Sequence, residues 1–597
     1  MVRLSKIATD EKAEKIYDAR LMKRFLRYTL PYKGLLFLSL SLLPAISLLA
    51  LVQPYIIKVA VDNNMVPRVT EGMGLLVLFF TMAVVTEVLI RMFHYYVVQS
   101  LGQKVVYSIR KELFNHIQKL SLSYFEKTPV GSLLNRVTND VESLSEMVSS
   151  GVVSLMGDII TIVGIAAVMI ILNLKLALVS FSILPLLLVG TLLIRKGMRK
   201  VYREIRIKLA EISAFIQENV AGIKVIQLYL REKKNEENFQ KINGAYFKAT
   251  LRANFFDAFL FSFVEIAGAF AVALILWYGG MKEMEGAMTF GVLVAFIEYL
   301  NKIFVPIKDL SAKFSVIQAA MAAMERIFSL IDTEPDIKEP SAPLMMKEIS
   351  GKIEFNNVSF SYGRGKVINN LSFCVDAGEK VALVGATGAG KSTIIKLLSR
   401  MYDVTEGNVL VDGMDIKKMS LGQLRKNVGM VPQDFFIFSG TIFDNISLGR
   451  EEIDLNNVKV AAEKVMASRF IEKMPRRYYS EIKEKGVNLS MGQKQLLSLA
   501  RVMAHDPKIL VLDEATSSID VATELYIQKG IRTLFEDRTS IIIAHRLSTI
   551  KDVDRIIVLH KGEIREEGRH NELLEKKGLY YRLYQLQYQD QESFNAA

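Results

Sequence analysis

Cysteine is nearly absent from the sequence, because Cys374 is the only residue of its kind among 597. A single cysteine excludes an intramolecular disulfide and a paired-cysteine metal site. Cys374 lies in an apolar run typical of a strand, so we expect a small core residue. The sequence also lacks an early apolar core followed by a small-residue cleavage site, and we therefore expect no removable signal peptide.

The composition indicates two unlike halves. A chain of this length exceeds one hydrophobic core and has room for two or three domains. Hydrophobic residues make up 51% and the mean hydropathy is +0.25, which is high for a soluble protein that is still 23% charged. A net charge of +12 suits nucleic acid or the anionic face of a membrane. Because the basic residues crowd around apolar segments, we expect the positive charge to face a membrane surface and expect no nucleic-acid partner.

Six segments of the first half are apolar over about 20 residues, the length that crosses a bilayer. The third and fourth are separated only by Asn173, so they must form a tight hairpin. The first and last contain Pro44, Pro54 and Pro306, which membrane helices tolerate when neighbours satisfy the backbone. The predicted spans are residues 35–61, 75–98, 152–172, 174–194, 255–278 and 290–307.

Basic residues in the linkers predict the topology. The N-terminus, residues 103–142 and the stretch after the fourth span are rich in lysine and arginine, whereas the turns after spans one, three and five are short and carry few. The positive-inside rule places both termini and both long linkers in the cytoplasm. Apolar residues recur at helical spacing in these linkers, so we expect the spanning helices to continue beyond the membrane.

Ionisable residues inside the spans predict polar contacts, because a charge in lipid by default faces a partner, water or substrate. Glu87 and Arg91 are four residues apart and can pair on one helix face. Glu265 and Glu298 have no partner nearby in the sequence and are better candidates for a polar cavity. His94 and Asp158 are further ionisable residues inside the spans.

A domain boundary follows the last span. Residues 332–350, DTEPDIKEPSAPLMMKEIS, gather prolines and charges and interrupt the helical periodicity. We therefore predict a transmembrane domain over residues 1–332, a linker over 333–350 and a second domain over 351–597.

A nucleotide-binding loop opens the second domain. The run KVALVGATGAGKSTIIKLL is a strand, a glycine-rich turn and a helix, the setting that the GxxxxGK[ST] pattern requires. In such a loop backbone N–H groups cradle phosphates, the lysine reaches the outer phosphates and the serine binds Mg²⁺. The residues predicted to bind the phosphates are Gly385, Gly388, Gly390, Lys391, Ser392 and Thr393.

A second run, KILVLDEATSS, is a buried strand that ends in two carboxylates. Asp513 stands where such a strand holds the Mg²⁺ shell, and Glu514 is placed to polarise an attacking water. Alone, this run would be interpreted as a core strand with a solvated acidic end. Beside the glycine-rich loop it predicts ATP hydrolysis.

Several further motifs together resemble one family along nearly the whole chain. The chain is similar to a half-transporter of the bacterial multidrug-type ABC exporter family. LSMGQKQ (489–495) resembles the LSGGQ signature of ABC ATPases, KEKG (483–486) the X-loop and SSID (517–520) the D-loop. YFEKTPVGSLLNRVTNDVE and ENVAGIKVIQLYLRE resemble the family's cytoplasmic loop segments. The resemblance implies adenine stacking by Tyr362, Mg²⁺ sensing by Gln433, a γ-phosphate contact from His545, and phosphate contacts in a partner from Ser490, Gly492 and Gln493.

The resemblance also implies an architecture and a mechanism. We expect a membrane α-helical bundle of six transmembrane helices, fused to an α/β P-loop ABC ATPase domain. Two such ATPase domains close head to tail over ATP, and hydrolysis reopens them, so that the helices alternate between inward and outward openings. The expected cofactors are ATP and Mg²⁺, and the expected location is the bacterial inner (cytoplasmic) membrane.

One residue departs from the family pattern. Met491 replaces the second glycine of the signature, and a bulky side chain beside phosphate should crowd or reorient the approach. This favours a heterodimer in which a different half-transporter supplies the intact signature, with a homodimer as the alternative.

Substrate class stays open on the sequence alone. An exporter of amphipathic compounds, a lipid flippase for envelope building and an ATP-gated channel share this architecture. Glu514 and the absence of a long regulatory insertion argue against the channel. A mostly apolar cavity with a few charges suits drug and lipid alike.

Overall fold

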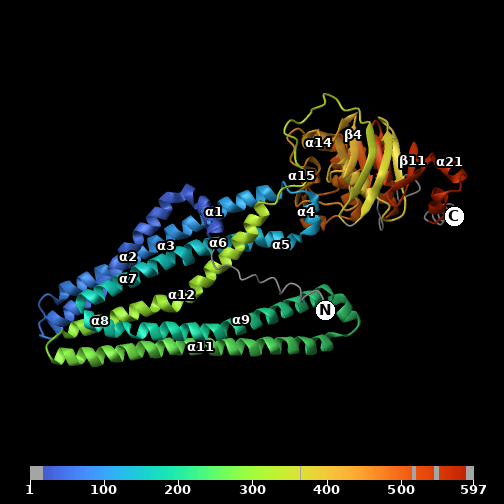
Figure 1. The fold of residues 1–597 in the computed structure, drawn as a ribbon. Helices are drawn as coiled ribbons and strands as arrows, with labels where there is room; N and C mark the ends of the chain where they lie inside the picture. Colours follow the sequence, from blue (N-terminus) through green and yellow to red (C-terminus); the bar gives the residue numbers. More distant parts are fainter. Residues whose placement is uncertain (1–17, 364, 514–519, 544–549, 587–597) are drawn as a thin grey trace. The chain divides into compact units, whose positions relative to one another are not determined.

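The computed structural model describes residues 18–363, 365–513, 520–543 and 550–586. The chain divides into two compact units (Figure 1). The first comprises Met1–Gln118 and Val130–Thr333, and the second comprises Lys119–Pro129 and Glu334–Ala597. The second unit therefore takes a short piece of chain from between two helices of the first. The predicted domain limits remain a prediction.

The first unit is built from long helices. Among the described residues, six helices are long and apolar enough to cross a membrane, which confirms the six predicted spans. Figure 1 shows α9 and α11 running side by side as a long pair. The helices of this unit are α1 (Ala19–Thr29), α2 (Lys33–Ala60), α3 (Met73–Ile117), α5 (Val130–Asn135), α6 (Val141–Glu146), α7 (Ser154–Leu172), α8 (Leu174–Phe181), α9 (Ile183–Ala221), α10 (Ile223–Leu228), α11 (Glu232–Met284) and α12 (Phe290–Ile331).

The longest helices exceed the bilayer. At about 1.5 Å per residue, the 45 residues of α3 and the 53 residues of α11 run well past a hydrocarbon core of about 30 Å. The predicted continuation of the spanning helices beyond the membrane is therefore present. Asn173 makes the predicted hairpin: its backbone is extended, and its side chain accepts a hydrogen bond from the Leu176 N–H at 3.0 Å, which caps the next helix.

Glu87, Arg91 and Asp158, three of the ionisable residues predicted in the spans, have charged partners. Arg91 donates to Glu87, as their spacing predicts. Lys313 on α12 pairs with Asp158 on α7. Glu265 is exposed when the membrane unit is considered alone. Glu298 is half-buried and lies one helix turn before Lys302, and its negative charge attracts the Lys302 ammonium. These contacts satisfy charges that would otherwise be costly in lipid.

The second unit contains two large sheets. The six-stranded sheet has the order β12-β11-β3-β10-β9-β6, and its strands pair in parallel except for β12. The four-stranded sheet has the order β2-β1-β4-β5 and is antiparallel where its pairs are described. The strands are β1 (Ile353–Ser361), β2 (Lys366–Val375), β3 (Lys380–Val384), β4 (Glu406–Val411), β5 (Met414–Asp415), β6 (Val428–Val431), β7 (Gly440–Thr441), β8 (Glu481–Ile482), β9 (Ile509–Asp513), β10 (Thr539–Ile543), β11 (Arg555–His560) and β12 (Glu563–Gly568).

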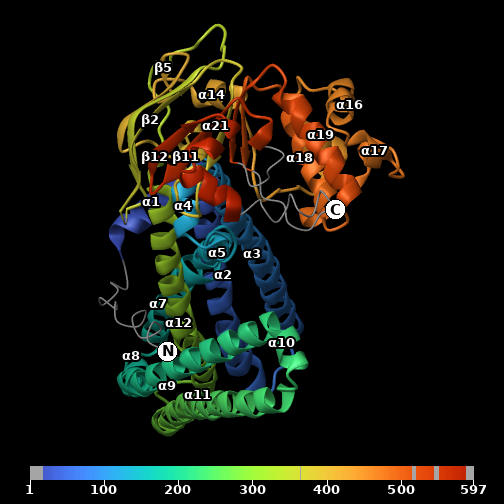
Figure 2. The ribbon, with the colours of Figure 1, turned by 90° about the vertical axis from the view of Figure 1, so that its right-hand side faces the viewer.

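Helices cover both faces of the parallel sheet, as continuous apolar strands require. Along β3, Val381 and Leu383 face a core shared with the antiparallel sheet, whereas Ala382 and Val384 face a core built with α15, α16, α18 and α19. Figure 2 shows α16, α17, α18 and α19 together in one lobe and β2, β5 and β12 in the other. The helices of the unit are α4 (Leu122–Lys127), α13 (Lys391–Leu398), α14 (Leu421–Asn427), α15 (Ile442–Ser447), α16 (Leu455–Lys464), α17 (Ser468–Ile471), α18 (Met491–His505), α19 (Val521–Phe535) and α21 (His570–Glu575).

The expected core position of Cys374 is wrong. On β2, Phe373 and Val375 are buried, and Cys374 between them is only partly buried because alternate side chains of a strand point to opposite faces. Its sulfur approaches Asp376 at 3.9 Å rather than the core.

Candidate nucleotide-binding site

The glycine-rich loop joins the end of β3 to the start of α13. Gly388 and Gly390 have φ values of 83° and 102°, a left-handed backbone that favours glycine. Gly385 is needed for space, because a Cβ there would lie 2.4 Å from the Leu559 carbonyl oxygen on β11. The three glycines of the motif thus let the backbone turn tightly at the carboxyl edge of the parallel sheet, with the N-terminus of α13 behind it.

Lys391 is the buried cation of this loop. Only 8% of the residue is exposed, and its Nζ donates to the carbonyl oxygens of Gly385 at 2.5 Å and Ala386 at 3.2 Å. Burial lowers the pKa of Lys391, and the negative charge of Asp513 opposes that shift. Lysine and aspartate from two separate motifs are therefore close enough to interact.

Two predicted Mg²⁺ ligands follow neighbouring strands. Asp513 ends β9, and Gln433 comes two residues after β6. Because β6 and β9 pair in parallel, with Val431 opposite Leu512, their carboxyl ends meet at one edge of the sheet. Gln433 and Ser392 are exposed there. Among the described residues, no group of three His, Cys, Asp or Glu side chains is placed to hold a metal ion.

The signature begins α18 with a capping box. The Gln493 N–H donates to Ser490 Oγ at 3.2 Å, and the Ser490 N–H donates to Gln493 Oε1 at 2.9 Å. Both predicted side chains thus hold the helix N-terminus in shape, while Gly492 is buried. Met491 is the first residue of the helix, has no left-handed backbone and is 54% exposed. Methionine at this position therefore costs no backbone strain, and its effect is confined to its side chain.

The adenine-stacking candidate lies beside the loop. Tyr362 directly follows β1, is 40% exposed and has its hydroxyl 3.3 Å from Thr393 Oγ1. The two remaining predicted residues, Glu514 and His545, lie outside the described residues. In the sequence they follow the ends of β9 and β10, which pair with each other.

Comparison with known proteins agrees with this geometry. The family model described as "ABC transporter transmembrane region" matches residues 36–307, and the model described as "ABC transporter" matches residues 368–517. An ATP-dependent lipid A-core flippase of Desulfotalea psychrophila is 34% identical, over 96% of this chain and all of its own length. The chain belongs to the ABC transporter family.

Other relatives refine the place of this ABC transporter within the family. A putative multidrug export ATP-binding/permease protein of Bacillus subtilis is 34% identical over 95% of this chain and 99% of its own. A solved structure of a bacterial Atm1-family ABC exporter with ATP bound has a TM-score of 0.76 at 28% identity, covering 96% and 99% of the two chains. The expected exporter fold is confirmed, and with it an ATPase domain that binds ATP and couples its hydrolysis to transport. As a half-transporter, the chain works with a second half, either another chain or itself.

Sequence reasoning missed one partly buried residue of this ABC transporter's ATPase unit. Arg501, on the signature helix α18, donates from Nε to the Asn445 carbonyl oxygen at 2.9 Å and from both terminal nitrogens to the Phe436 carbonyl oxygen at 3.3 Å. It thereby ties the segment that follows Gln433 to the signature helix, and burial lowers its pKa. In the sequence Arg501 stands in an ordinary amphipathic helix, and no local pattern marks it.

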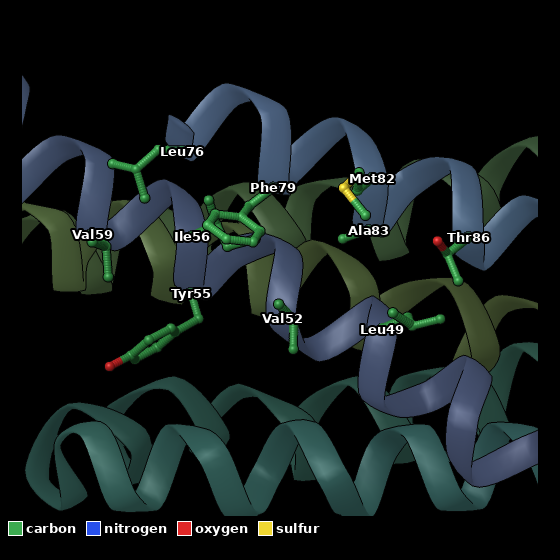
Figure 3. A pocket seen from close by; sticks show the side chains of 10 residues that line it. All are labelled: Leu49, Val52, Tyr55, Ile56, Val59, Leu76, Phe79, Met82, Ala83 and Thr86. Atoms are coloured by element: carbon green, nitrogen blue, oxygen red, sulfur yellow. The ribbon is translucent and has the colours of Figure 1, made fainter. Parts of the chain in front are cut away.

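The membrane unit contains an apolar pocket of ≈ 500 Å³ between α2 and α3 (Figure 3). Of the ten lining residues, Tyr55 and Thr86 carry a side-chain hydroxyl, and the other eight are apolar. The lining residues are Leu49, Val52, Tyr55, Ile56 and Val59 of α2 and Leu76, Phe79, Met82, Ala83 and Thr86 of α3.

A polar cluster lies next to lining residues of this pocket on both helices. Gln53, next to Val52, donates to Glu87, which is next to Thr86 and is also held by Arg91. Lys302 of α12 donates to Gln53 Oε1 at 2.9 Å. The membrane unit therefore offers an apolar cavity and charged groups within one helix turn of each other.

Proposed function

We propose that this ABC exporter subunit moves amphipathic compounds, drugs or lipids, from the cytoplasm or the inner leaflet by alternating access. The observation that carries the proposal is the apolar pocket between α2 and α3 beside the Gln53–Glu87–Lys302 cluster. A molecule with a hydrocarbon body and a polar head is complementary to such a pair of surfaces. The polar head contacts the cluster, and the apolar body fills the pocket.

A lipid flippase is the second candidate. It is favoured by the relative named an ATP-dependent lipid A-core flippase, which aligns with nearly the whole chain. An acyl chain fits the same pocket, so the geometry supports both substrates. The proposed location is the inner (cytoplasmic) membrane, with both termini and the ATPase domain in the cytoplasm, because the basic residues of the chain concentrate in the linkers on that side.

The ATPase chemistry is assigned to the loop and its neighbours. Lys391 holds the outer phosphates, and the backbone N–H groups after Gly388 cradle them. Ser392, Gln433 and Asp513 are oxygen donors at one sheet edge, a set that fits Mg²⁺, which takes its other ligands from phosphate and water. Bound Mg²⁺ would neutralise charge on the phosphates. Glu514 polarises the attacking water and His545 contacts the γ-phosphate.

Glu514→Gln tests this assignment. The variant should bind ATP as the wild type does and lose turnover by orders of magnitude, because the group that polarises water is gone. ATP binding and hydrolysis are measured on the purified assembly. Hydrolysis near the wild-type rate would refute the role of Glu514.

The proposed assembly is a heterodimer with two unequal ATP sites. The support is Met491, whose exposed side chain stands on the helix N-terminus that would face a partner's nucleotide. Expression of the chain alone and with a neighbouring half-transporter, followed by mass and ATPase measurements, tests it. A homodimer with two equal hydrolysing sites, unaffected by Met491→Gly, would contradict it.

The substrate proposal is tested in proteoliposomes. ATPase activity is measured while phospholipids and then cationic dyes are titrated, with Lys391→Ala as the inactive control. The ratio of stimulated to basal activity should fall in Ala83→Phe, which fills the pocket, and stay unchanged in Val85→Phe, two residues along the same helix and outside the lining. An equal response of the two variants would exclude the pocket as the substrate site.

A further inference from the structure

Tyr362, the adenine-stacking candidate, lies in a cluster of three aromatic rings. Phe360, Tyr362 and Tyr402 meet edge to face, with centroid distances of 4.8 Å between Phe360 and Tyr362, 5.6 Å between Phe360 and Tyr402 and 5.2 Å between Tyr362 and Tyr402. Phe360 is buried and anchors the group. Lys396, on α13, places Nζ 5.7 Å from the Tyr362 ring centre and 5.8 Å from the Tyr402 ring centre. We call Phe360, Tyr362, Lys396 and Tyr402 the aromatic platform.

A carboxylate from a distant part of the sequence holds this platform. Glu126 lies on α4, which belongs to the same compact unit. It accepts a hydrogen bond from the Tyr402 hydroxyl at 2.6 Å and another from Lys396 Nζ at 2.9 Å. These bonds to Tyr402 and then to Lys396 lower the pKa of Glu126, and burial together with the bond to Glu126 raises the pKa of the Tyr402 phenol. At neutral pH the pair is therefore a carboxylate and a neutral phenol.

We propose that Glu126 is a positioning residue for nucleotide base binding, acting on Tyr362 through Tyr402 and Lys396. The proposal rests on the proposed stacking of adenine on Tyr362. Glu126 fixes both neighbours of that ring: Tyr402 packs against its edge, and Lys396 lies near it as a cation whose charge the carboxylate balances. The bond of the Tyr362 hydroxyl to Thr393 connects the same ring to the phosphate-binding helix.

Loss of Glu126 should therefore affect the base and spare the phosphates. Without the carboxylate, Tyr402 loses its charged hydrogen-bond acceptor and Lys396 loses its counter-ion. The Tyr402 ring, which packs against Tyr362, is then free to rotate. The predicted phosphate contacts come from Lys391, Ser392, Thr393 and the loop backbone, and the hydrogen bonds described for Glu126 reach only Tyr402 and Lys396. A residue that merely stabilised the unit would weaken the binding of every ligand alike.

The experiment compares ATP with inorganic tripolyphosphate, which has the phosphates and no base. Dissociation constants are measured on the full chain for the wild type, Glu126→Gln and Tyr402→Phe. Asp552→Asn is the matched control, because it breaks an exposed ion pair with Arg532 elsewhere in the unit. We expect both test variants to weaken ATP by about 3- to 10-fold, the effect of one lost hydrogen bond, and to leave tripolyphosphate unchanged. Tyr402→Phe keeps the ring and serves where Glu126→Gln fails to fold.

A double variant separates this inference from the stacking role itself. In a Tyr362→Ala background, Glu126→Gln should cost no further ATP affinity, because its effect passes through the missing ring. Equal weakening of ATP and tripolyphosphate, or a persistent loss in the Tyr362→Ala background, would overturn the role of Glu126 while stacking stands. Unchanged ATP affinity in Tyr362→Ala alone would overturn the stacking role and the inference together.

Discussion

Lys302 should stabilise the membrane unit chiefly by satisfying a carbonyl that Pro54 leaves without its helical donor. In a regular helix the N–H of residue 54 would donate to the carbonyl of residue 50, and proline has no N–H. Lys302 Nζ donates to that Ala50 oxygen at 3.0 Å and to Gln53 Oε1 at 2.9 Å. The sequence analysis predicted that neighbouring helices satisfy the backbone at the prolines. At Pro54 a single ammonium on α12, that of Lys302, does so.

The magnitude follows from the cost of an unpaired acceptor. Lys302→Met leaves the Ala50 carbonyl unsatisfied inside the bundle, which costs about 1–3 kcal/mol of unfolding free energy. In a Pro54→Ala background the restored N–H can donate to the same oxygen, so this part of the cost disappears. We therefore expect a coupling energy of about 1–3 kcal/mol between the two positions in a double-mutant cycle.

The assay is unfolding in mixed detergent micelles with increasing dodecyl sulfate, followed through Trp277, the only tryptophan. A matched control uses the next carbonyl: Tyr299 donates to the Leu51 oxygen at 2.7 Å, where the N–H of residue 55 is intact. Tyr299→Phe should couple to Pro54→Ala by less than about 0.5 kcal/mol. Additive effects of Lys302→Met and Pro54→Ala would refute the reasoning, and so would equal coupling in the control cycle.

Three further predictions concern the ATPase unit. Lys391→Met should raise the melting temperature measured without nucleotide, because burial penalises the ammonium, as its lowered pKa indicates. The same variant should abolish the rise in melting temperature that ATP produces in the wild type. An unchanged melting temperature without nucleotide, or an unchanged rise with ATP, would refute this. Gly385→Ala should destabilise more than Gly388→Ala, since a Cβ meets the Leu559 oxygen at the first position and open space at the second, where only the left-handed backbone costs about 1–2 kcal/mol; thermal unfolding of both variants decides it. The stability gained from Glu126 should be present above its ordinary pKa of 4.5 and be lost as pH falls below it, because the folded pKa is depressed; chemical unfolding of the wild type and Glu126→Gln from pH 7 to pH 3 should therefore converge at the acid end.

Local patterns carried the sequence predictions that were confirmed. A bilayer span is a property of about 20 consecutive residues, so the six helices were visible in hydropathy alone. The glycine-rich loop was visible for a similar reason, because strand, turn and helix are contiguous there. Cys374 shows where local patterns fail: an apolar run predicts a strand, but which alternate face meets the core is set by the neighbouring sheet.

The sequence by itself determined the membrane half, the ATPase half, the family and the glycine-rich loop between strand and helix. The tertiary structure decided which side chains support those elements. Lys302 reaches Ala50 across 252 residues, Tyr402 reaches Glu126 across 276, and Arg501 reaches the Phe436 carbonyl across 65. The physical reason is that a hydrogen bond depends on the approach of two atoms to about 3 Å, and for residues so far apart that approach is set by the packing of whole helices and sheets.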